Sequence, residues 1–561
     1  MRLTTVIVRH FRCIRELSVD LDDTTVLIGE NNTGKTAFLE AIRICLDRLR
    51  GRSSNVFHEY DYHLKGEEST PAEAAPIEIE LSFVEPELGA WEEEIVQELD
   101  SIAVFGDDDL YQVRFRITSS FNQETDTFET DWYFLDAEGN PTRNASQLIT
   151  LQRLVPVFYL SALRDASTHF GARGRFWRTF LSEANIPEEE RRKLEEEFAD
   201  LNSQLINAHQ PLADVRSRLE DAKRVIDFGS GDAVAIDALP SKLFSLLSRT
   251  QVSLTSSAGA KIPVEHQGEG TQSLAVLLLF GAFLRSQLSN LDPIAEPITA
   301  LEEPEAHLHP SAIRSLMTIV NDLPGQKLLS SHSGDLLSSV DPCSVRRFVR
   351  RDGGIHVHRI QPGSLTQEDT RKFDFHVRRS RGELLFARCW LLVEGETETT
   401  LLTGVGEAIG LELERVGVRS VEFGQTDVGM LAKIANQLGI EWYCVLDDDS
   451  GRKKYEKSVR AQFNAKSETD RLIFPYQNIE RFLCENGFGD LYEARMSQQK
   501  QQPTSTHGTT AYWKEVLKAL PGRYSKPAVA LEAVFKMKTG DVTVPPLLKS
   551  ILEKAISLAE R

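Results

Sequence analysis

The feature that most constrains the fold is a glycine-rich loop, GENNTGKT, that lies between an apolar run and an amphipathic segment. The run before it, TTVLIG, is β-branched and apolar, as expected of a buried strand. The segment after it, TAFLEAIRICLDRL, carries apolar residues at helical spacing. A strand, a glycine-rich loop and a helix in this order form a phosphate-binding loop. We therefore predict an α/β domain that binds a nucleotide here.

The loop supplies the residues that would hold the nucleotide. Backbone N–H groups of such a loop and of the helix N-terminus cradle phosphates, and Gly29, Asn32 and Gly34 belong to this loop. Lys35 would reach the β- and γ-phosphates, and the hydroxyl of Thr36 would ligate Mg²⁺. ATP with Mg²⁺ is the expected cofactor.

A nucleotide site also needs an acid at the end of a buried strand, and PITALEEPEAHLHP supplies it. Its apolar residues lead to Glu302, which would orient the Mg²⁺ shell, and to Glu303, which would polarise the attacking water. Downstream, KLLSSHSGDLL is a second apolar strand that ends near His332. A lone histidine is more often structural than catalytic, but this one follows a second strand after a phosphate-site acid.

Together these segments resemble the ABC-type ATPase heads of the SMC/RecF group of DNA-repair proteins. EEPEAHLHP resembles the Walker B segment of that group, with Glu302 in place of the commoner Asp. SSHS resembles its switch segment, which implies that His332 senses the γ-phosphate. For the Q-loop glutamine, Gln152 is the candidate.

QGEGTQSLAVL resembles the degenerate signature motif of the same group. The resemblance implies that Gly268 and Gly270 contact a nucleotide bound by the opposite subunit, so that ATP is sandwiched in a homodimer or higher homo-oligomer. Between the motifs, residues 185–226 are charged, lack glycine and carry apolar residues at helical spacing, which predicts a helical hairpin broken near His209 and Pro211. A layer on the ATPase and a dimerisation arm are equal alternatives.

A second constellation lies far downstream. CWLLVEGETETTLLTGV is an apolar strand that ends at Glu394 and leads into a helix with Glu398 on its first turn. IEWYCVLDDDSG is another apolar strand, and it ends in Asp447 and Asp449. In a parallel sheet both strand ends open on one edge, and strand alternation sends the two aspartates to one side. Carboxylates in this number suit Mg²⁺ or Mn²⁺.

The spacing E-x₃-E followed by D-x-D resembles the Toprim fold. A Toprim domain after an ABC head is the architecture of the OLD (overcoming lysogenization defect) nuclease family, which includes the Gabija A subunit and retron-associated effectors. The resemblance implies Glu480 as a further metal ligand, Ser450 as a minor ligand and Lys526 near the scissile phosphate. Glu396 would face solvent.

Size and composition limit the classes of protein to which the chain can belong. At 561 residues the chain is too long for one core. The net charge of −20 argues against a nucleic-acid partner, but net charge does not report the local field, and basic clusters such as RKK at 452–454 stand out. The longest apolar run, residues 274–284, is too short for a membrane span. Scattered cysteines and the lack of a leader indicate a cytoplasmic protein.

We therefore expect an α/β chain with an ABC-type ATPase head, a Toprim domain and a helical C-terminal segment. The expected divisions are an ATPase at 1–370 with a helical insertion at about 180–226, a linker at 371–383, a Toprim core at 384–490 and helices at 491–561.

The favoured function is an ATP-binding, metal-dependent DNA endonuclease acting in phage defence, with its ATPase as a regulator. A helicase, a reverse transcriptase with its DNA, or no partner are alternatives. An SMC-like structural or repair ATPase with an inert Toprim domain is the competing hypothesis. Topoisomerase-like strand passage needs a catalytic tyrosine, and no tyrosine has an identifying context.

Overall fold

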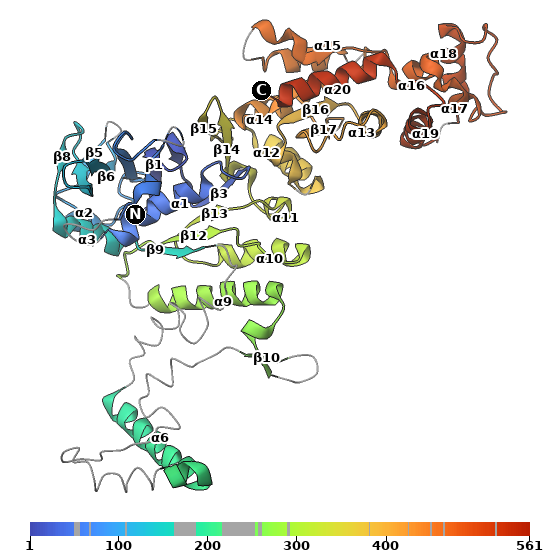
Figure 1. The fold of residues 1–561 in the computed structure, drawn as a ribbon. Coiled ribbons are helices and arrows are strands. Elements are labelled where there is room, and N and C mark those ends of the chain that lie inside the picture. Colours follow the sequence, from blue (N-terminus) through green and yellow to red (C-terminus); the bar gives the residue numbers. More distant parts are fainter. Residues whose placement is uncertain are drawn as a thin grey trace, which may run out of the picture.

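The structure is a computed structural model with three main sheets (Figure 1). It describes residues 1–49, 56–64, 66, 69–106, 109–161, 187–215, 253–255, 261–288, 292–380, 382–424, 426–448, 452–463, 466–521 and 524–560. Two sheets belong to the N-terminal two thirds of the chain, and the third belongs to the C-terminal part.

The central sheet carries the phosphate-binding loop. Its strand order is β15 (Gly354–His358), β14 (Val345–Arg351), β3 (Thr24–Gly29), β13 (Gln326–Ser330), β12 (Ile298–Glu302) and β9 (Val157–Leu160). All neighbours are parallel except β14 and β15. Along β3, Val26 and Ile28 face one core and Leu27 faces the other, so both sheet faces are covered. The predicted apolar strand is thus a central, buried one.

Helices cover the two faces of this sheet. α1 (Lys35–Arg43) packs on one face, and α9 (Glu269–Leu288) and α10 (Pro310–Asn321) pack on the other. The longest apolar run of the chain lies in α9, whose Val276 and Phe280 are buried. Within the described ranges no helix is both long and apolar enough to cross a membrane.

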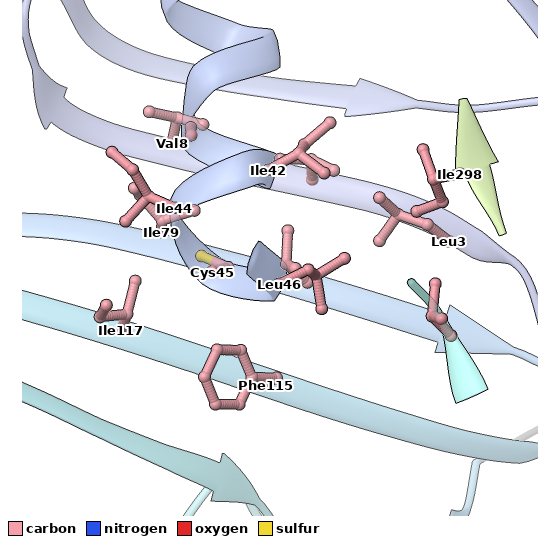
Figure 2. Packing of buried hydrophobic residues seen from close by; sticks show 14 of the residues in the cluster. Leu3, Val8, Ile42, Ile44, Cys45, Leu46, Ile79, Phe115, Ile117 and Ile298 are labelled. Carbon is pink, nitrogen blue, oxygen red and sulfur yellow. The ribbon is translucent and has the colours of Figure 1, made fainter. Parts of the chain in front are cut away.

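An antiparallel sheet lies over α1. Its order is β2 (Ile14–Asp20), β1 (Leu3–Phe11), β4 (Ile77–Val84), β6 (Tyr111–Asn122), β7 (Thr127–Leu135) and β8 (Pro141–Thr142), with β5 (Val104–Phe105) paired to β6. Figure 2 shows Ile42, Ile44 and Leu46 from α1 and the turn after it packing against Ile79 and Phe115 of this sheet. α1 is therefore packed between two sheets, and this packing holds its N-terminus at the phosphate site.

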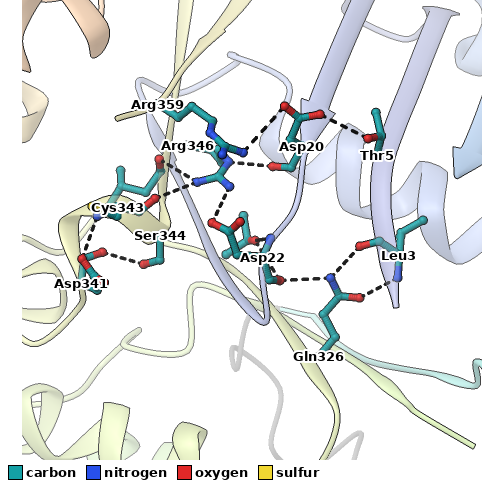
Figure 3. A network of polar contacts seen from close by, with 12 residues as sticks. Leu3, Thr5, Asp20, Asp22, Gln326, Asp341, Cys343, Ser344, Arg346 and Arg359 are labelled. Atoms are coloured by element: carbon teal, nitrogen blue, oxygen red, sulfur yellow. Dashed lines mark hydrogen bonds and ion pairs between the residues drawn. The ribbon is translucent and has the colours of Figure 1, made fainter. Parts of the chain in front are cut away.

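A buried polar network joins the two N-terminal sheets (Figure 3). The fully buried guanidinium of Arg346 donates to the carbonyl oxygen of Asp20 at 2.7 Å and to the carboxylate of Asp22 at 2.6 Å. The side chain of Gln326 bonds both backbone groups of Leu3, at 3.2 and 2.8 Å. Because a buried polar group is costly unless it is bonded, this network fixes the register between the sheets.

The third sheet is parallel, in the order β17 (Val418–Glu422), β16 (Cys389–Val393), β18 (Glu441–Val445) and β19 (Leu472–Ile473). Its helices are α13 (Glu396–Ala408), α14 (Val428–Gln437), α15 (Arg452–Arg460), α16 (Ile479–Leu483), α17 (Gly489–Glu493), α18 (Thr510–Ala519), α19 (Lys526–Thr539) and α20 (Pro546–Ala559). Strand alternation sends Trp390 and Leu392 toward the core shared with the central sheet, and Leu391 and Val393 toward the C-terminal helices.

The segment for which we predicted a polar linker, 371–383, is instead mostly helical. α12 (Gln367–Arg379) begins at a capping box between Thr366 and Asp369. Phe373 and Val377, four residues apart, are buried in the core shared by the two α/β parts. The many charges of this segment lie on the other face of an amphipathic helix, so the prediction of a linker was wrong.

One arginine joins the two parts. Arg347 of β14 is buried, and its guanidinium donates to four carbonyl oxygens at 2.8–3.1 Å, those of Leu385, Ala387, Leu438 and Gly439. Burial, reinforced by the charges of Arg351 and Arg388, lowers the pKa of Arg347 to about 10. The contact is continuous with an apolar core, so it is a fixed joint.

Part of the predicted hairpin is described. α6 (Glu188–Ala208) ends where His209 leaves helical geometry, and helical residues resume at 210–215. Residues 180–186 and 216–226 of the predicted insertion lie outside the described residues. The remaining elements are α2 (Glu93–Glu98), α3 (Ala145–Leu154), α11 (Gly334–Leu337), β10 (Ser253–Thr255) and β11 (Lys261–Pro263).

Candidate functional site

The glycine-rich loop follows β3 and ends at the N-terminus of α1. Gly34 has φ +88°, a left-handed conformation that glycine adopts without strain, and it starts the helix. The ammonium of Lys35 folds back onto the loop and donates to the carbonyls of Gly29 and Glu30, both at 2.9 Å. Burial lowers the pKa of Lys35 to about 8, although Glu303 and Glu30 oppose this shift. A buried cation whose partners are two carbonyls and the hydroxyl of Thr33, all uncharged, suits a ligand that is a polyanion.

The other predicted loop residues lie at the same sheet edge. Thr36 is exposed on the first turn of α1, and Asn32 is exposed with φ +60°. Glu302 ends β12, two strands away from β3. Its Oε1 is buried without a hydrogen-bond partner among the described residues, so an acceptor is available there for a metal and its water shell. The residues present therefore fit Mg²⁺ with a nucleotide.

The predicted water-polarising acid and switch histidine are neighbours. Nε2 of His332 lies 3.6 Å from Oε1 of Glu303. Glu303 has φ +42°, a strained conformation for a residue with a side chain, and its N–H donates to the carbonyl of Ser330. Burial, and then the charge of Lys35, lower the pKa of His332. The structure thus brings Glu303, His332 and Lys35 to one site.

Glu305 is a functional residue that the sequence analysis missed. Its Oε1 accepts hydrogen bonds from Ser331 Oγ at 2.7 Å and from the His332 N–H at 2.9 Å. Burial raises the pKa of Glu305 despite these bonds. This carboxylate holds the switch segment in place, and its signal was the third acid of EEPEAHLHP.

Three further predicted nucleotide residues lie in two different places. Gly268 and Gly270 lie at the N-terminus of α9, where Glu269 pairs with His307 at 3.0 Å, so the signature-like segment packs on the loop after β12. Gln152, by contrast, donates to the carbonyls of Cys45 and Leu49. These carbonyls lie at the opposite end of the α1 segment from Thr36, so the assignment of Gln152 to the Q-loop was wrong.

The second site gathers acids from several elements. Glu394 follows β16, Glu398 lies on the first turn of α13, Asp447 follows β18 and Glu480 lies on α16. Burial of the Tyr476 phenol raises its pKa well above the usual value, and all four of these carboxylates raise it further. All four carboxylates therefore lie within electrostatic reach of one phenol. Tyr476 was not predicted, because no local motif surrounds it.

Two of these acids are strongly buried. Glu398 and Glu480 each expose 7% of their surface. Burial raises the pKa of Glu398 to about 7, and the charges of Glu480 and Glu394 add to this shift. Lys526, at the N-terminus of α19, forms an ion pair with Glu480. Burial alone would lower the pKa of Lys526, but the bond to Glu480 raises it. The structure thus places Lys526 against the acid cluster.

The donor set of this site fits a hard divalent cation. Clustered oxygen ligands suit Mg²⁺ or Mn²⁺, and a bound cation would favour the ionised form of Glu398, whose pKa is raised chiefly by burial. Within the described ranges, no three acidic, histidine or cysteine side chains already converge closely enough to share one ion. Asp449 and Ser450 lie outside the described residues, whereas the neighbouring Asp448 is exposed and pairs with Arg452 at 2.5 Å. Glu396 is exposed, as predicted.

A cavity of about 260 Å³ lies between the phosphate loop and the beginnings of β16 and β18, at the opposite strand ends from the acid site. Glu30 and His332 line it from one side, and Arg388 and Gly439 line it from the other. The Arg388 guanidinium pairs with the Glu30 carboxylate at 2.7 Å. The phosphate loop therefore touches the residue that immediately precedes β16.

Comparison with known proteins assigns both parts. Residues 1–383 match the family model described as "Protein of unknown function (DUF2813)". The chain belongs to the DUF2813 family. Residues 385–449 match the model described as "Overcoming lysogenization defect protein-like, TOPRIM domain". The predicted α/β fold class and the predicted Toprim domain of the OLD type, which follows the N-terminal α/β part, are confirmed.

Curated relatives of this DUF2813 chain cover most of its length. "Uncharacterized protein YbjD" of Escherichia coli (strain K12) is 29% identical over 100% of this chain and 99% of its own length. The "OLD nuclease" of Thermus scotoductus is 24% identical over 79% and 81%, and the "Endonuclease GajA" of Bacillus cereus is 21% identical over 82% and 77%. A solved SMC head bound to the C-winged helix domain of ScpA aligns with a TM-score of 0.37 at 15% identity, covering 65% of this chain and 98% of that chain.

Proposed function

We propose that this DUF2813 chain is an ATP-binding, divalent-metal-dependent DNA endonuclease. The observation that carries the proposal is the gathering of Glu394, Glu398, Asp447 and Glu480 around Tyr476, with Lys526 beside them. Relatives named as an OLD nuclease and an endonuclease, which match about four fifths of the chain, support the same chemistry.

The acid cluster would hold the metal ions, with Asp449 and Ser450 as further proposed ligands. Two bound Mg²⁺ or Mn²⁺ ions would stabilise the attacking and leaving oxygens of an in-line phosphodiester hydrolysis. Glu398 must give up its proton before it can ligate a cation, because only the ionised carboxylate is a strong ligand. The ammonium of Lys526 would offset negative charge on the phosphate.

The ATPase site would regulate this chemistry. Lys35, Thr36 and Glu302 would bind Mg²⁺ and ATP, Glu303 would polarise the water, and His332 would sense the γ-phosphate. Gly268 and Gly270 would contact the nucleotide of a second subunit in a homodimer. The pair between Glu30 and Arg388 connects the phosphate loop to the start of β16, and this strand, which leads to Glu394, would be the route from nucleotide binding to the acid cluster. We further propose a role in phage defence.

The test is cleavage of supercoiled plasmid with Mg²⁺ or Mn²⁺, with and without ATP. Wild type should nick or linearise the plasmid, Glu394→Ala should not, and Lys35→Ala should change only the response to ATP. Equal activity of wild type and Glu394→Ala would show that the acid cluster is not the active site. If wild type cleaves no DNA with either metal, the chain is better explained as a structural ATPase with an inert Toprim domain.

A further inference from the structure

A groove of about 690 Å³ begins beside the acid cluster and is separate from it. It lies between α12, the segment after β17 and α15. Gly424 lines the groove and lies against the backbone of Glu394: a Cβ at this position would come within 2.6 Å of the Glu394 carbonyl oxygen. The N–H of Phe423 donates to the carbonyl of Val393 at 2.9 Å. One end of the groove therefore adjoins the strand end that carries Glu394.

The groove is cationic, although the chain as a whole is acidic. Lys372, Lys454 and Lys457 line it, and Asp427 is the acid among its lining residues. Asp427 is engaged in the fold, because its carboxylate accepts from the Gly429 N–H at 3.2 Å and from Ser458 Oγ at 2.8 Å. Lys372 pairs with Glu368 at 2.6 Å, so the positive charge of the groove comes mainly from Lys454 and Lys457, in contrast with a net charge of −20 for the whole chain.

The two lysines on α15 are available to a ligand. Val459 is buried and the ring of Tyr455 packs edge-on against Phe423 at 5.3 Å, so this face anchors the helix. The arginines of the helix are engaged in ion pairs, Arg452 with Asp448 and Arg460 with Glu456. Lys454 and Lys457 are exposed, lie three residues apart on one helix face, and form no ion pair with any residue in the described part of the chain.

We propose that this groove binds the sugar–phosphate backbone of duplex DNA next to the bond that the acid cluster cleaves. The inference rests on the proposed function and adds the path of the substrate. Lysine ammonium groups bind phosphates as point charges and carry no base information, so the groove positions DNA of any sequence. An acidic cluster alone repels a polyanion, and a cationic groove beside it supplies the attraction that brings the phosphate to the metals.

Binding of a fluorescein-labelled 40-base-pair duplex to the full chain tests the groove, with Ca²⁺ in place of Mg²⁺ to suppress cleavage. Lys454→Gln/Lys457→Gln should raise Kd roughly 10-fold at moderate salt, and should reduce the slope of log Kd against log salt by about 2. At saturating DNA in Mg²⁺ the cleavage rate should match wild type, while KM rises. Lys454→Arg/Lys457→Arg should bind like wild type, because it keeps both positive charges. This variant shows whether the glutamine variant loses affinity through lost charge or through misfolding.

The matched control is Lys514→Gln/Lys518→Gln, which removes the same charge from α18, at the far end of the C-terminal helices from α15 (Figure 1). It should leave Kd and the salt slope unchanged. An equal loss in both double variants, or no change in the groove variant, would overturn the proposal. If wild type binds but never cleaves, and the groove variant still loses affinity, the groove assignment stands while the nuclease assignment fails.

Discussion

The two candidate sites are electrostatic opposites built on the same sheet geometry. Each opens at the carboxyl edge of a parallel sheet. In the phosphate site a cation, Lys35, is buried against carbonyls and its pKa is lowered to about 8. In the acid site a carboxyl group, Glu398, is buried beside other acids and its pKa is raised to about 7. Each site holds charge that a ligand of opposite sign would relieve, a triphosphate in one and divalent metal in the other.

The sites also differ in how the chain assembles them. One contiguous stretch supplies the phosphate loop, and the ends of β12 and β13 add Glu302, Glu303 and His332, whereas the acid site takes residues from β16, α13, β18, α16 and α19. A contiguous site depends on local geometry, and a dispersed site depends on the packing of the whole domain. We therefore expect substitutions at the acid site to change both the cleavage rate and the stability of the fold. Matched control variants distinguish these two effects.

The largest effect should come from Asp447→Asn. Loss of a metal ligand removes stabilisation that exists mainly in the transition state, so plasmid cleavage should fall by about 10³-fold. Asp448→Asn is the matched control, because Asp448 is the next residue but pairs with Arg452 on the surface. It should stay within about 3-fold of wild type. Similar losses in both variants would place Asp447 outside the metal site.

The next effect should be on nucleotide binding. Lys35→Ala removes a charged hydrogen-bond donor from the phosphates and should weaken ATP binding roughly 100-fold, as measured with a fluorescent ATP analogue. Lys327→Ala is the control, because Lys327 pairs in register with Thr24 at the opposite end of β3 from the loop. Cleavage without ATP should be unchanged in both variants. Loss of ATP-independent cleavage in Lys35→Ala would mean that the two sites are not separable.

Part of the fold and of the two candidate sites could be predicted from the sequence. The phosphate loop, Glu303, His332 and the strand ends at Glu394 and Asp447 follow from local patterns, because each lies directly after a recognisable apolar strand. Tyr476 and Glu305 were missed, since their roles come from burial among residues distant in the chain.

The linker prediction failed for a related reason. Charged residues dominate 371–383, and they favoured the prediction of a linker. The helical spacing of Phe373 and Val377 indicated the amphipathic helix that the structure contains. Gln152 was assigned from its residue type and its position in the sequence alone. Its hydrogen-bond partners depend instead on how α3 packs against the end of the helical segment that begins at Lys35.

A smaller effect concerns stability and pH. The folded-state pKa of Glu398 is raised to about 7, above the ordinary value of 4.5 that applies to the unfolded chain, so between these values the folded state binds more protons. The free energy of unfolding of the metal-free protein should therefore fall as pH rises from 4.5 through 7, by about 3 kcal/mol from this residue.

Glu398→Gln removes that dependence. The variant should be more stable than wild type at pH 8 and similar at pH 5, as measured by thermal unfolding in chelator. Glu396→Gln, on the same helical turn but exposed, should show no such difference. Mg²⁺ should restore the stability of wild type at pH 8 and help Glu398→Gln less. A wild type whose stability does not vary between pH 5 and 8 would contradict the burial of Glu398.

The smallest effect should come from the contact between the phosphate loop and the residue before β16. Glu30 and Arg388 form an exposed pair, so its free energy is about 0.2–1 kcal/mol. Glu30→Arg or Arg388→Glu should change the ratio of cleavage with and without ATP by a few-fold. The double swap Glu30→Arg/Arg388→Glu should restore the ratio, because it restores the attraction. Additive effects in a double-mutant cycle would show that the pair does not couple the sites.

Arg347 has a mechanical consequence. Four carbonyl oxygens of the Toprim part converge on one buried guanidinium that belongs to the central sheet. A hinge motion here would have to break several hydrogen bonds of Arg347 at once, so the two parts rotate as one rigid body. Under the proposed function, a rotation of the N-terminal part on nucleotide exchange would turn the acid cluster by the same angle, and the displacement there would grow with its distance from the axis of rotation.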